Sequence, residues 1–390
     1  MYVLYEYEST DLDITRRQAW SLSKSDFVDV EPAHGDRWRV TARAFVGSLI
    51  VDGLQLLIRP KINPDNLFLL LEPGLPTSAW RQEAFEYNVT SDLLQSMIAF
   101  FARTAETTLE RGVYRSYEAR SEVLTAMRGR LDIPAQLSRA GVLTSVACSY
   151  DEYSDDVLEN RILRAAVRKS LMVPGVDQSE RHRLMRVLAS LEGVSDTPIS
   201  SESVSLVHFT RLNEHYKPAL GLARLILSNL TLTDSYGSVA ASSFMVDMND
   251  LFQRFVTQRL RQSLRHRLEV VDEPKVHLGE NRQVSMFPDL EFRDVKYRTV
   301  YVGDIKYKLT DDAQGRSSDY YQLLAYTTAL DLEEGILIYC KKGGERTSRT
   351  VTVKNNRKRL VLHSVDLSGT PKQVDAEIKF LADSIAKHIC

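Results

Sequence analysis

The hydrophobic residues of the chain change their spacing twice, and these changes divide the sequence into three parts. Up to about residue 75 apolar and polar residues alternate, as in β-strands. From Thr90 apolar residues recur every third or fourth position, which is typical of amphipathic helices, and beyond about residue 243 the two patterns alternate. Because 390 residues exceed the usual size of one domain, we expect a β-rich N-terminal module (1–89), a mainly helical middle region (90–238) and a C-terminal α/β domain with a mixed central sheet (239–390).

A β-hairpin is predicted in the N-terminal module. Asp52 and Gly53 stand between the apolar runs 49–51 and 54–58. The Asp-Gly pair favours the positive φ angles of a type I′ turn. The segment 59–61 (Arg-Pro-Lys) then ends the second strand, because proline cannot donate a ladder hydrogen bond.

The composition limits the compartment and the kind of binding surface. The formal net charge is −2, so a nucleic-acid-binding surface must be local. Cys148, Cys340 and Cys390 lie far apart, which argues against a disulfide framework and a cysteine zinc site and favours the reducing cytoplasm. Residues 1–7 lack the features of a signal peptide, and the apolar stretch 44–58 is too interrupted to span a membrane.

Several helices and strands follow from the periodicity. Helices are expected at 157–172, 182–191, 218–230, 247–265, 318–330 and from 371 to the end. Strands are expected near 268–271, 284–287, 295–305, 336–340, 350–353 and 360–365. The acidic stretch 149–156 is too charged to be buried without partners.

Two short acidic motifs point to metal-dependent phosphodiester hydrolysis. The sequence Pro288-Asp289 ends one predicted strand, and Asp304, Ile305 and Lys306 end a later one. Residues two apart on a strand share a face, so Asp304 and Lys306 project together, and the Lys306 ammonium would lie beside the attacking water or the scissile phosphate. Mg²⁺, for which Mn²⁺ substitutes, typically takes one or two protein carboxylates. Asp289 from the neighbouring strand would complete its site, with the Ile305 carbonyl as a further ligand.

The helix that follows adds polar residues to this site. Gln322 and Tyr326 lie four apart and so share one helix face. With Asp319 and Tyr320 they are expected to border the substrate groove, where Gln322 would hydrogen-bond near the metal or a phosphate. An aspartate two residues before a lysine usually lies on the solvated face of a strand. The combination of Asp289, Asp304 and Lys306 with Gln322 and Tyr326, in this order along the chain, favours a catalytic site.

Two basic clusters are candidates for phosphate contacts with double-stranded DNA, which add affinity without sequence information. They consist of Arg261, Arg265 and Arg267, and of Lys354, Arg357, Lys358 and Arg359. Each is also compatible with an ordinary solvated surface. The second cluster is the stronger candidate, because it lies inside the domain that carries the carboxylates.

The order of these C-terminal elements resembles the PD-(D/E)xK nuclease superfamily, and the Gln-x-x-x-Tyr element resembles its RecB-like branch. Segments elsewhere in the chain are similar to McrC, the nuclease subunit of type IV McrBC restriction systems. These segments are residues 50–62, 127–132, 150–156, 159–163 and 247–252.

The resemblance implies a Mg²⁺-dependent endonuclease subunit of a modification-dependent restriction complex that defends against phage. In that family a McrB-like hexameric AAA+ GTPase reads modified cytosine and translocates DNA, and the N-terminal part of the nuclease subunit stimulates GTP hydrolysis. The hairpin at Asp52 and Gly53, together with Arg59 and Lys61, would make that contact; an ordinary hairpin tip with solvated charges is the alternative. No Gly-x-x-x-x-Gly-Lys-Ser/Thr motif occurs, so the GTPase must be another polypeptide.

One residue departs from the family pattern, and two other functions stay open. Gln253 replaces a glutamate of many relatives, so a second metal ion would lack a ligand. A non-catalytic activator of the GTPase would keep its function without residues 240–390. A stand-alone RecB-like or resolvase-type nuclease would cut DNA without partner or nucleotide.

Overall fold

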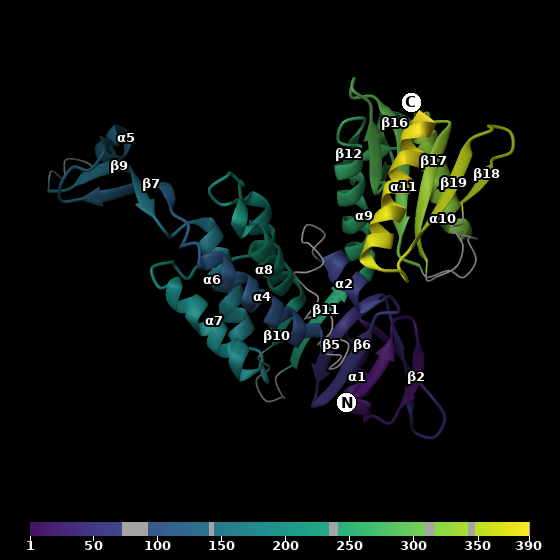
Figure 1. Ribbon diagram of the computed structural model, residues 1–390, viewed down its shortest axis with the longest axis horizontal. Coiled ribbons are helices and arrows are strands. Elements are labelled where there is room, and N and C mark those ends of the chain that lie inside the picture. Colours follow the sequence, from purple (N-terminus) through teal and green to yellow (C-terminus); the bar gives the residue numbers. More distant parts are fainter. Residues whose placement is uncertain (72–92, 140–143, 234–240, 309–315, 342–347, 390) are drawn as a thin grey trace. The chain divides into compact units, whose positions relative to one another are not determined.

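A computed structural model describes residues 1–71, 93–139, 144–233, 241–308, 316–341 and 348–389. The chain forms two compact units (Figure 1). One unit combines Met1–Ser96 with Leu232–Cys390, and the other is Met97–Thr231. The architecture is multidomain α/β, as predicted. The predicted domain boundaries after residues 89 and 238 lie outside the described residues.

Two sheets build the N-terminal module. The five-stranded sheet has the order β1 (Tyr2–Tyr5), β6 (Leu54–Arg59), β5 (Phe45–Val51), β11 (Ala241–Asp247) and β10 (Leu230–Thr233). The three-stranded sheet has the order β2 (Ser9–Leu12), β4 (Trp38–Ala42) and β3 (Val28–Pro32). Both sheets contribute to one hydrophobic core, which includes Leu4, Val40 and Leu56.

The predicted hairpin between β5 and β6 is confirmed. Asp52 and Gly53 have φ angles of 46° and 73°, as a type I′ turn requires. The turn packs on α1 (Arg16–Ser23), where Ser21 Oγ donates to Asp52 Oδ2 at 2.5 Å and Arg17 Nη2 lies 3.2 Å from Asp52 Oδ1. The carboxylate at the hairpin tip is therefore already bound within the module.

Strand β11 returns the chain to the N-terminal sheet. It pairs antiparallel with β5, with Met245 opposite Gly47 and Asp247 opposite Phe45. Residues 241–243, which are small and polar, therefore belong to a strand of the module. Directly after β11 the chain enters α9 (Met248–Leu264), whose N-cap is Asp247.

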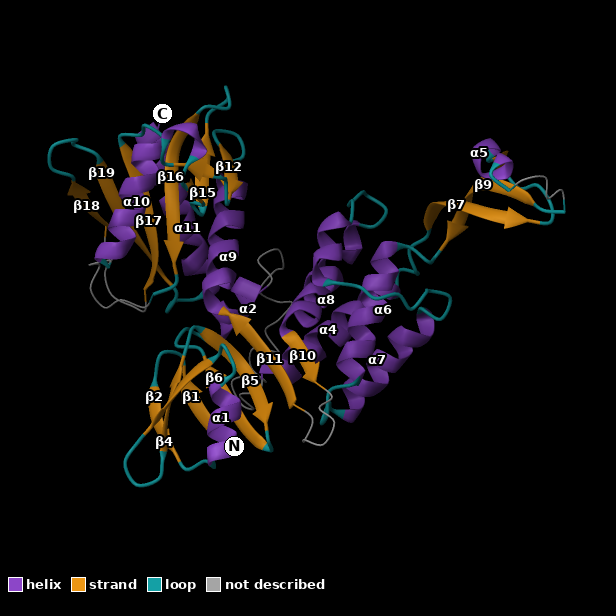
Figure 2. Ribbon diagram, turned by 180° about the vertical axis from the view of Figure 1, so that it is seen from behind, coloured by secondary structure: helices purple, strands orange, loops and turns teal. Residues whose placement is uncertain are grey.

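A six-stranded mixed sheet forms the C-terminal domain (Figure 2). Its order is β12 (Glu269–Asp272), β15 (Leu290–Arg293), β16 (Thr299–Lys306), β17 (Glu334–Lys341), β19 (Arg359–Asp366) and β18 (Ser348–Thr352). β16, β17 and β19 are parallel; the other neighbours are antiparallel. The domain also contains α10 (Ser317–Ala329), α11 (Pro371–Ile389) and a small sheet of β13 (Val276–His277) and β14 (Ser285–Met286).

The side chains of β16 alternate between two helices. Val302 packs with Leu323 and Tyr326 of α10. Tyr307, just past the strand, contacts the ring of Phe252 in α9 at a centroid distance of 5.8 Å. The even-numbered residues of β16 therefore point to the face that α10 covers, and the odd-numbered ones toward α9.

The second unit contains helices close to their predicted positions. They are α4 (Leu93–Leu109, on the boundary between the units), α6 (Leu158–Leu171), α7 (Gln178–Ser190) and α8 (Lys217–Asn229). The predicted helix at 182–191 begins earlier, at Gln178, because Asp177 caps it. Short 3₁₀ helices cover Ser201–Leu206, Glu214–Tyr216 and, in the other unit, Glu280–Arg282. No described helix is long and apolar enough to cross a membrane.

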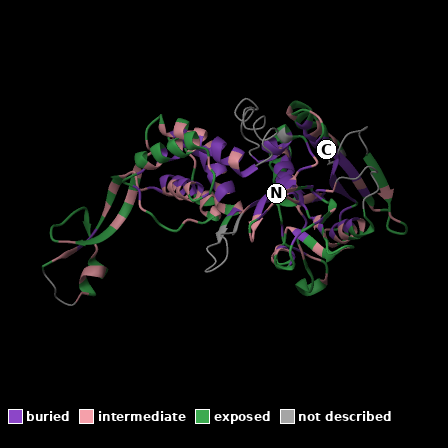
Figure 3. Cartoon of the chain, turned by 90° about the horizontal axis from the view of Figure 1, so that it is seen from below, coloured by how far each residue is buried: buried purple, intermediate pink, exposed green. Residues whose placement is uncertain are grey.

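An unpredicted β-arm belongs to the second unit. It consists of β7 (Ser116–Leu124), β9 (Val146–Ser154), β8 (Arg130–Leu131) and the short helix α5 (Ile133–Leu137). Figure 3 shows that the arm is largely exposed.

Two arginines of this unit pair with carboxylates of the same unit. Arg161 binds Asp156 at 2.8 Å, and Arg128 Nη1 lies 3.3 Å from Glu152 Oε1.

Candidate active site

The sheet places Asp289 beside the end of β16. Leu290, the first residue of β15, is opposite Gly303 of β16, so the preceding Asp289 lies next to Asp304. The expectation that Asp289 ends a strand at 284–287 is wrong. β14 stops at Met286, and Asp289 leads into β15 instead, because Pro288 has no N–H with which to continue the ladder.

The start of β16 also differs from the prediction. The strand begins at Thr299 and not at residue 295. Asp294 Oδ1 accepts hydrogen bonds from the backbone amides of Lys296 and Arg298, and Tyr297 has a φ of 59°. These bonds hold 294–298 as a turn, which competes with strand pairing.

The three residues of the predicted catalytic centre come together. Asp289 Oδ2 accepts a hydrogen bond of 2.6 Å from the Ile305 amide, and Lys306 Nζ lies 2.7 Å from Asp304 Oδ2. Asp304 and Lys306 thus share a strand face, as their spacing predicts. The Ile305 amide keeps the Asp289 carboxylate at the end of β16, whereas its carbonyl as a metal ligand stays a prediction.

Burial and mutual repulsion change the protonation of the two carboxyls. Burial, followed by the negative charge of Asp304, raises the pKa of Asp289 to about 7. Burial also raises the pKa of Asp304, against the opposing effect of Lys306. For Lys306 burial lowers the pKa, but the carboxylates of Asp304 and Asp289 outweigh it and raise the pKa. The pair therefore needs more positive charge than Lys306 supplies to stay ionised near neutral pH.

A divalent cation fits this arrangement. Asp304 is fully buried, and its Oδ1 atom has no hydrogen-bond partner among the described residues. A buried carboxylate oxygen without a partner is costly unless a cation binds it. No group of three or more His, Cys, Asp or Glu side chains in the described part of the chain is suited to hold an ion. Two carboxylates are enough for Mg²⁺, which keeps water and phosphate at its other positions.

Helix α10 contributes Gln322 and Tyr326 to the border of the site. Gln322 Nε2 donates to Tyr326 Oη at 2.6 Å, and Tyr326 Oη donates to the Phe287 carbonyl at 3.2 Å. Burial and the negative charge of Asp304 raise the pKa of Tyr326 to about 12, so the phenol stays protonated and able to donate. The pair thereby supports the segment that carries Asp289.

Lys308 is a residue near the site that the sequence interpretation missed. Its Nζ atom lies 2.7 Å from Asp319 Oδ2, which also accepts a hydrogen bond of 2.5 Å from Tyr339 Oη. Burial would raise the pKa of Asp319, but the hydrogen bonds from Lys308 and Tyr339 outweigh burial and lower this pKa. Asp319 therefore anchors α10 as an ionised partner. Lys308 follows Lys306 by two residues, as Lys306 follows Asp304, and this spacing could have indicated that Lys308 lies on the same side of the chain.

Gln253 lies close to the site but contacts a different carboxylate. Its Nε2 atom donates to Glu273 Oε1 at 3.2 Å, and the Glu273 amide donates to the Asp289 carbonyl at 3.3 Å. The neutral side chain of Gln253 supplies no carboxylate at this position, and the expectation that a second metal ion would lack a ligand stays a prediction.

Two of the four cations in the predicted DNA-binding cluster are engaged within the domain. Lys358 Nζ donates to the carbonyls of Leu332 at 2.6 Å and Thr327 at 3.2 Å, and Arg359 pairs with Glu334 at 2.5 Å. Lys354 and Arg357 are exposed. These two are the better placed for phosphate contacts.

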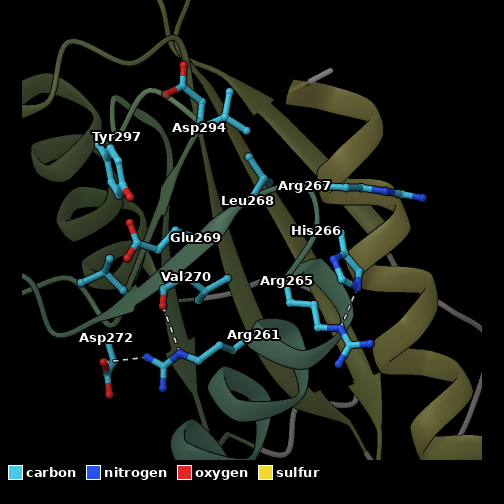
Figure 4. A pocket seen from close by; sticks show the side chains of 12 residues that line it. Arg261, Arg265, His266, Arg267, Leu268, Glu269, Val270, Asp272, Asp294 and Tyr297 are labelled. Carbon is cyan, nitrogen blue, oxygen red and sulfur yellow. Dashed lines mark hydrogen bonds and ion pairs between the residues drawn. The ribbon is translucent and has the colours of Figure 1, made fainter.

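The arginines of the other cluster line a pocket of about 700 Å³ (Figure 4). Arg261 is held by Asp272 Oδ1 at 2.8 Å and by the Val270 carbonyl at 3.1 Å. Acidic residues line the same pocket, namely Glu269, Asp272 and Asp294. Because these carboxylates offset the arginines, the pocket offers little net attraction for a phosphate backbone.

The two predicted partner-binding residues lie at the end of β6. Arg59 is its last residue, and Lys61 follows after Pro60. Both side chains are half-buried. The Lys61 amide donates to Glu6 Oε1 at 2.6 Å, so this segment is anchored by its backbone.

Known proteins resemble this chain in sequence and in fold. The family model described as McrBC 5-methylcytosine restriction system component matches residues 40–340. No curated protein matches the chain in sequence. A chain from the half-complex of the tetradecameric assembly of Thermococcus gammatolerans McrB AAA+ hexamers with bound McrC is 21% identical at a TM-score of 0.57, with 98% of this chain and 99% of that chain covered. A chain from the cryo-EM structure of the T. gammatolerans McrBC complex is 24% identical at a TM-score of 0.45, with 67% and 87% covered.

Proposed function

Because this chain belongs to the McrBC family of restriction-system components, we propose that it is the Mg²⁺-dependent endonuclease subunit of a cytoplasmic, modification-dependent restriction complex. The observation that carries the proposal is the buried pair of Asp289 and Asp304 beside Lys306, with one Asp304 oxygen left without a partner. Its substrate would be double-stranded DNA, with Lys354 and Arg357 as phosphate contacts.

The residues of the site have separate roles in this proposal. Asp289 and Asp304 would hold Mg²⁺, which supplies a polarised phosphate and a water of lowered pKa. Lys306 would place its ammonium group beside the phosphate and offset the negative charge that grows during hydrolysis. Gln322 and Tyr326 would keep the Asp289 segment in place.

The direct experiment is cleavage of methylated double-stranded DNA by the purified chain with its GTPase partner and GTP. We expect cleavage with Mg²⁺ or Mn²⁺ and none in EDTA, with Mg²⁺ restoring it. Cleavage that continues undiminished in EDTA would contradict the proposed chemistry.

Mg²⁺ is expected to stabilise the protein more at pH 8 than at pH 5.5. The folded-state pKa of Asp289 is raised to about 7, so the metal-free protein loses stability as the pH rises from the unfolded-state pKa near 4 toward 7. Mg²⁺ binds the ionised carboxylates, so the increase in Tm that it causes should grow over the same range. Thermal unfolding with and without Mg²⁺ measures this. An Asp289→Asn variant should show a smaller increase with a weaker pH dependence, since Asp304 remains, and a pH-independent increase in the wild type would contradict the prediction.

We further propose a McrB-like hexameric AAA+ GTPase as the partner, since the T. gammatolerans assembly contains McrB hexamers with bound McrC. The β-arm offers a surface for it besides Arg59 and Lys61. At its tip Met127, Ile133 and Leu137 are 65%, 58% and 76% exposed. Ile133 and Leu137 lie four residues apart on α5 and so share a helix face, and exposed apolar side chains that form a patch are typical of protein interfaces.

Replacing both Ile133 and Leu137 with aspartate should weaken partner binding by about 30-fold or more, since a central apolar contact contributes about 2 kcal/mol. Stimulation of GTP hydrolysis, titrated against the concentration of the chain, measures the change. Arg59→Ala with Lys61→Ala tests the other surface in the same assay. An unchanged titration curve for the arm variant would rule out the arm as the contact.

A further inference from the structure

Tyr307 ties the end of the catalytic strand to the N-terminal module. It follows Lys306 directly, is buried, and donates a hydrogen bond of 2.8 Å from its hydroxyl to Glu6 Oε1. The same oxygen accepts a hydrogen bond of 2.6 Å from the Lys61 amide. Tyr7 Oη in turn donates to the Tyr307 carbonyl at 3.1 Å. A single carboxylate oxygen therefore connects residue 61 with residue 307.

The geometry of the strand makes this connection relevant to the site. Lys306 and Tyr307 are neighbours, so their side chains point to opposite faces of the sheet. Lys306 pairs with Asp304 on one face, while Tyr307 contacts Phe252 and Glu6 on the other. A change in the position of Tyr307 must therefore turn the backbone that carries Lys306.

Other contacts hold the module and the domain together independently of Tyr307. In α2 (Pro64–Leu71) the Asn66 side-chain amide donates to the carbonyls of Leu367 at 2.8 Å and Gly369 at 2.7 Å. The Met248 amide donates to the Ala44 carbonyl at 2.8 Å. Loss of the Tyr307 hydroxyl should consequently loosen the end of β16 without separating the two parts.

We propose that Glu6 and Tyr307 are positioning residues for Asp304 and Lys306, and that they couple the segment around Lys61 to the active site. A partner that shifts residues 59–61 would move the Lys61 amide, and through Glu6 the end of β16. The inference rests on the proposed nuclease function. Displacement of a catalytic group by about 1 Å can lower the reaction rate by about a hundredfold. A small shift of residues 59–61 is therefore enough to change the rate of cleavage.

Tyr301 provides a matched control on the same strand. It is also buried, and its hydroxyl donates to Glu334 Oε1 at 3.0 Å. Tyr301→Phe and Tyr307→Phe each remove one buried hydrogen bond between a phenol and a carboxylate, and both should lower the Tm comparably. We expect Tyr307→Phe to reduce the rate of single-turnover cleavage at least about tenfold. We also expect it to weaken Mn²⁺ binding, which electron paramagnetic resonance measures. Tyr301→Phe should change neither by more than about twofold.

Several outcomes separate this inference from the proposed function. If the wild type cleaves and both tyrosine variants behave alike, Tyr307 has only a structural role and the inference is overturned. If the wild type itself does not cleave, the proposed function has failed instead. Glu6→Gln, which retains an acceptor oxygen, should stay closer to the wild type than Glu6→Ala; equal losses would contradict the hydrogen-bond explanation.

The coupling has its own test. The McrB-like partner should change the Mn²⁺ affinity of the wild type, and Mn²⁺ should change the affinity for the partner by the same factor. Tyr307→Phe should remove most of this effect, whereas Tyr301→Phe should retain it. A wild type whose Mn²⁺ affinity is the same with and without the partner would overturn the coupling.

Discussion

Replacing Asp304 with asparagine is expected to reduce Mg²⁺-dependent DNA cleavage by on the order of a thousandfold, as loss of one preorganised electrostatic group does in other enzymes. Asparagine has nearly the same shape but no negative charge. It removes one of the two carboxylates for the ion and also the partner of Lys306, 2.7 Å away. Single-turnover cleavage of methylated double-stranded DNA, with the partner and GTP present, measures the loss.

The same substitution should leave the metal-free fold about as stable as the wild type. Burial raises the pKa of Asp304, so above the unfolded-state value its ionisation destabilises the folded chain. Asparagine removes that penalty but also removes the ionic partner of Lys306, so the two effects oppose each other and the Tm in EDTA at pH 8 should change little. Glu334→Gln, at a buried carboxylate on the adjacent strand, is the control and should retain cleavage. Cleavage by Asp304→Asn at the wild-type rate would refute the site assignment, and a marked loss of Tm would mean that inactivity reflects misfolding.

Asp304→Asn also separates the nuclease from a non-catalytic activator. The variant keeps every surface through which a partner could bind, so stimulation of GTP hydrolysis should persist. If protection against phage also persists, the activator is the correct function. Deleting residues 240–390 is a poorer test, because it removes β11 from the five-stranded sheet. Cleavage by the chain alone, without nucleotide, would instead favour the stand-alone nuclease.

The arrangement at the end of β16 was predictable from local rules. Strand alternation places Asp304 and Lys306 together, and a helical spacing of four places Gln322 beside Tyr326. The position of Asp289 relative to its strand was not predictable in the same way. Residues 284–287 and β15 both have strand-like composition, and only the pairing with β16 shows which one Asp289 leads into.

Long-range pairing explains what the sequence did not reveal. β11 is small and polar at its start and gains its strand structure from β5, which lies far earlier in the chain. In the arm, β9 carries Tyr150, Asp151, Glu152 and Tyr153, none of which is buried. This part of β9 therefore lacks the hydrophobic alternation by which a strand is identified, and its structure depends on antiparallel pairing with β7.

Replacing Gly47 with alanine is expected to destabilise the chain by about 3 kcal/mol or more, or to prevent folding. Gly47 lies in β5 between β6 and β11. Its φ is +145°, and an added Cβ would lie 1.8 Å from the Phe244 carbonyl oxygen, so the β5–β11 ladder would have to open. Since Asp247 at the end of β11 caps α9 by accepting from the Asn249 amide at 2.8 Å, the damage should extend to the C-terminal domain.

Gly53→Ala is the matched control for this last prediction. Gly53 has a φ of +73°, but an added Cβ meets no atom within 4 Å. Only backbone strain of about 1 kcal/mol is then expected. Urea unfolding measures the stability of both variants, and cleavage should fall in Gly47→Ala alone. Equal stabilities for the two variants would mean that β11 does not pair with β5, and that the N-terminal module and the C-terminal domain do not share this strand. A larger loss for Gly47→Ala would instead support the pairing of β11 with β5.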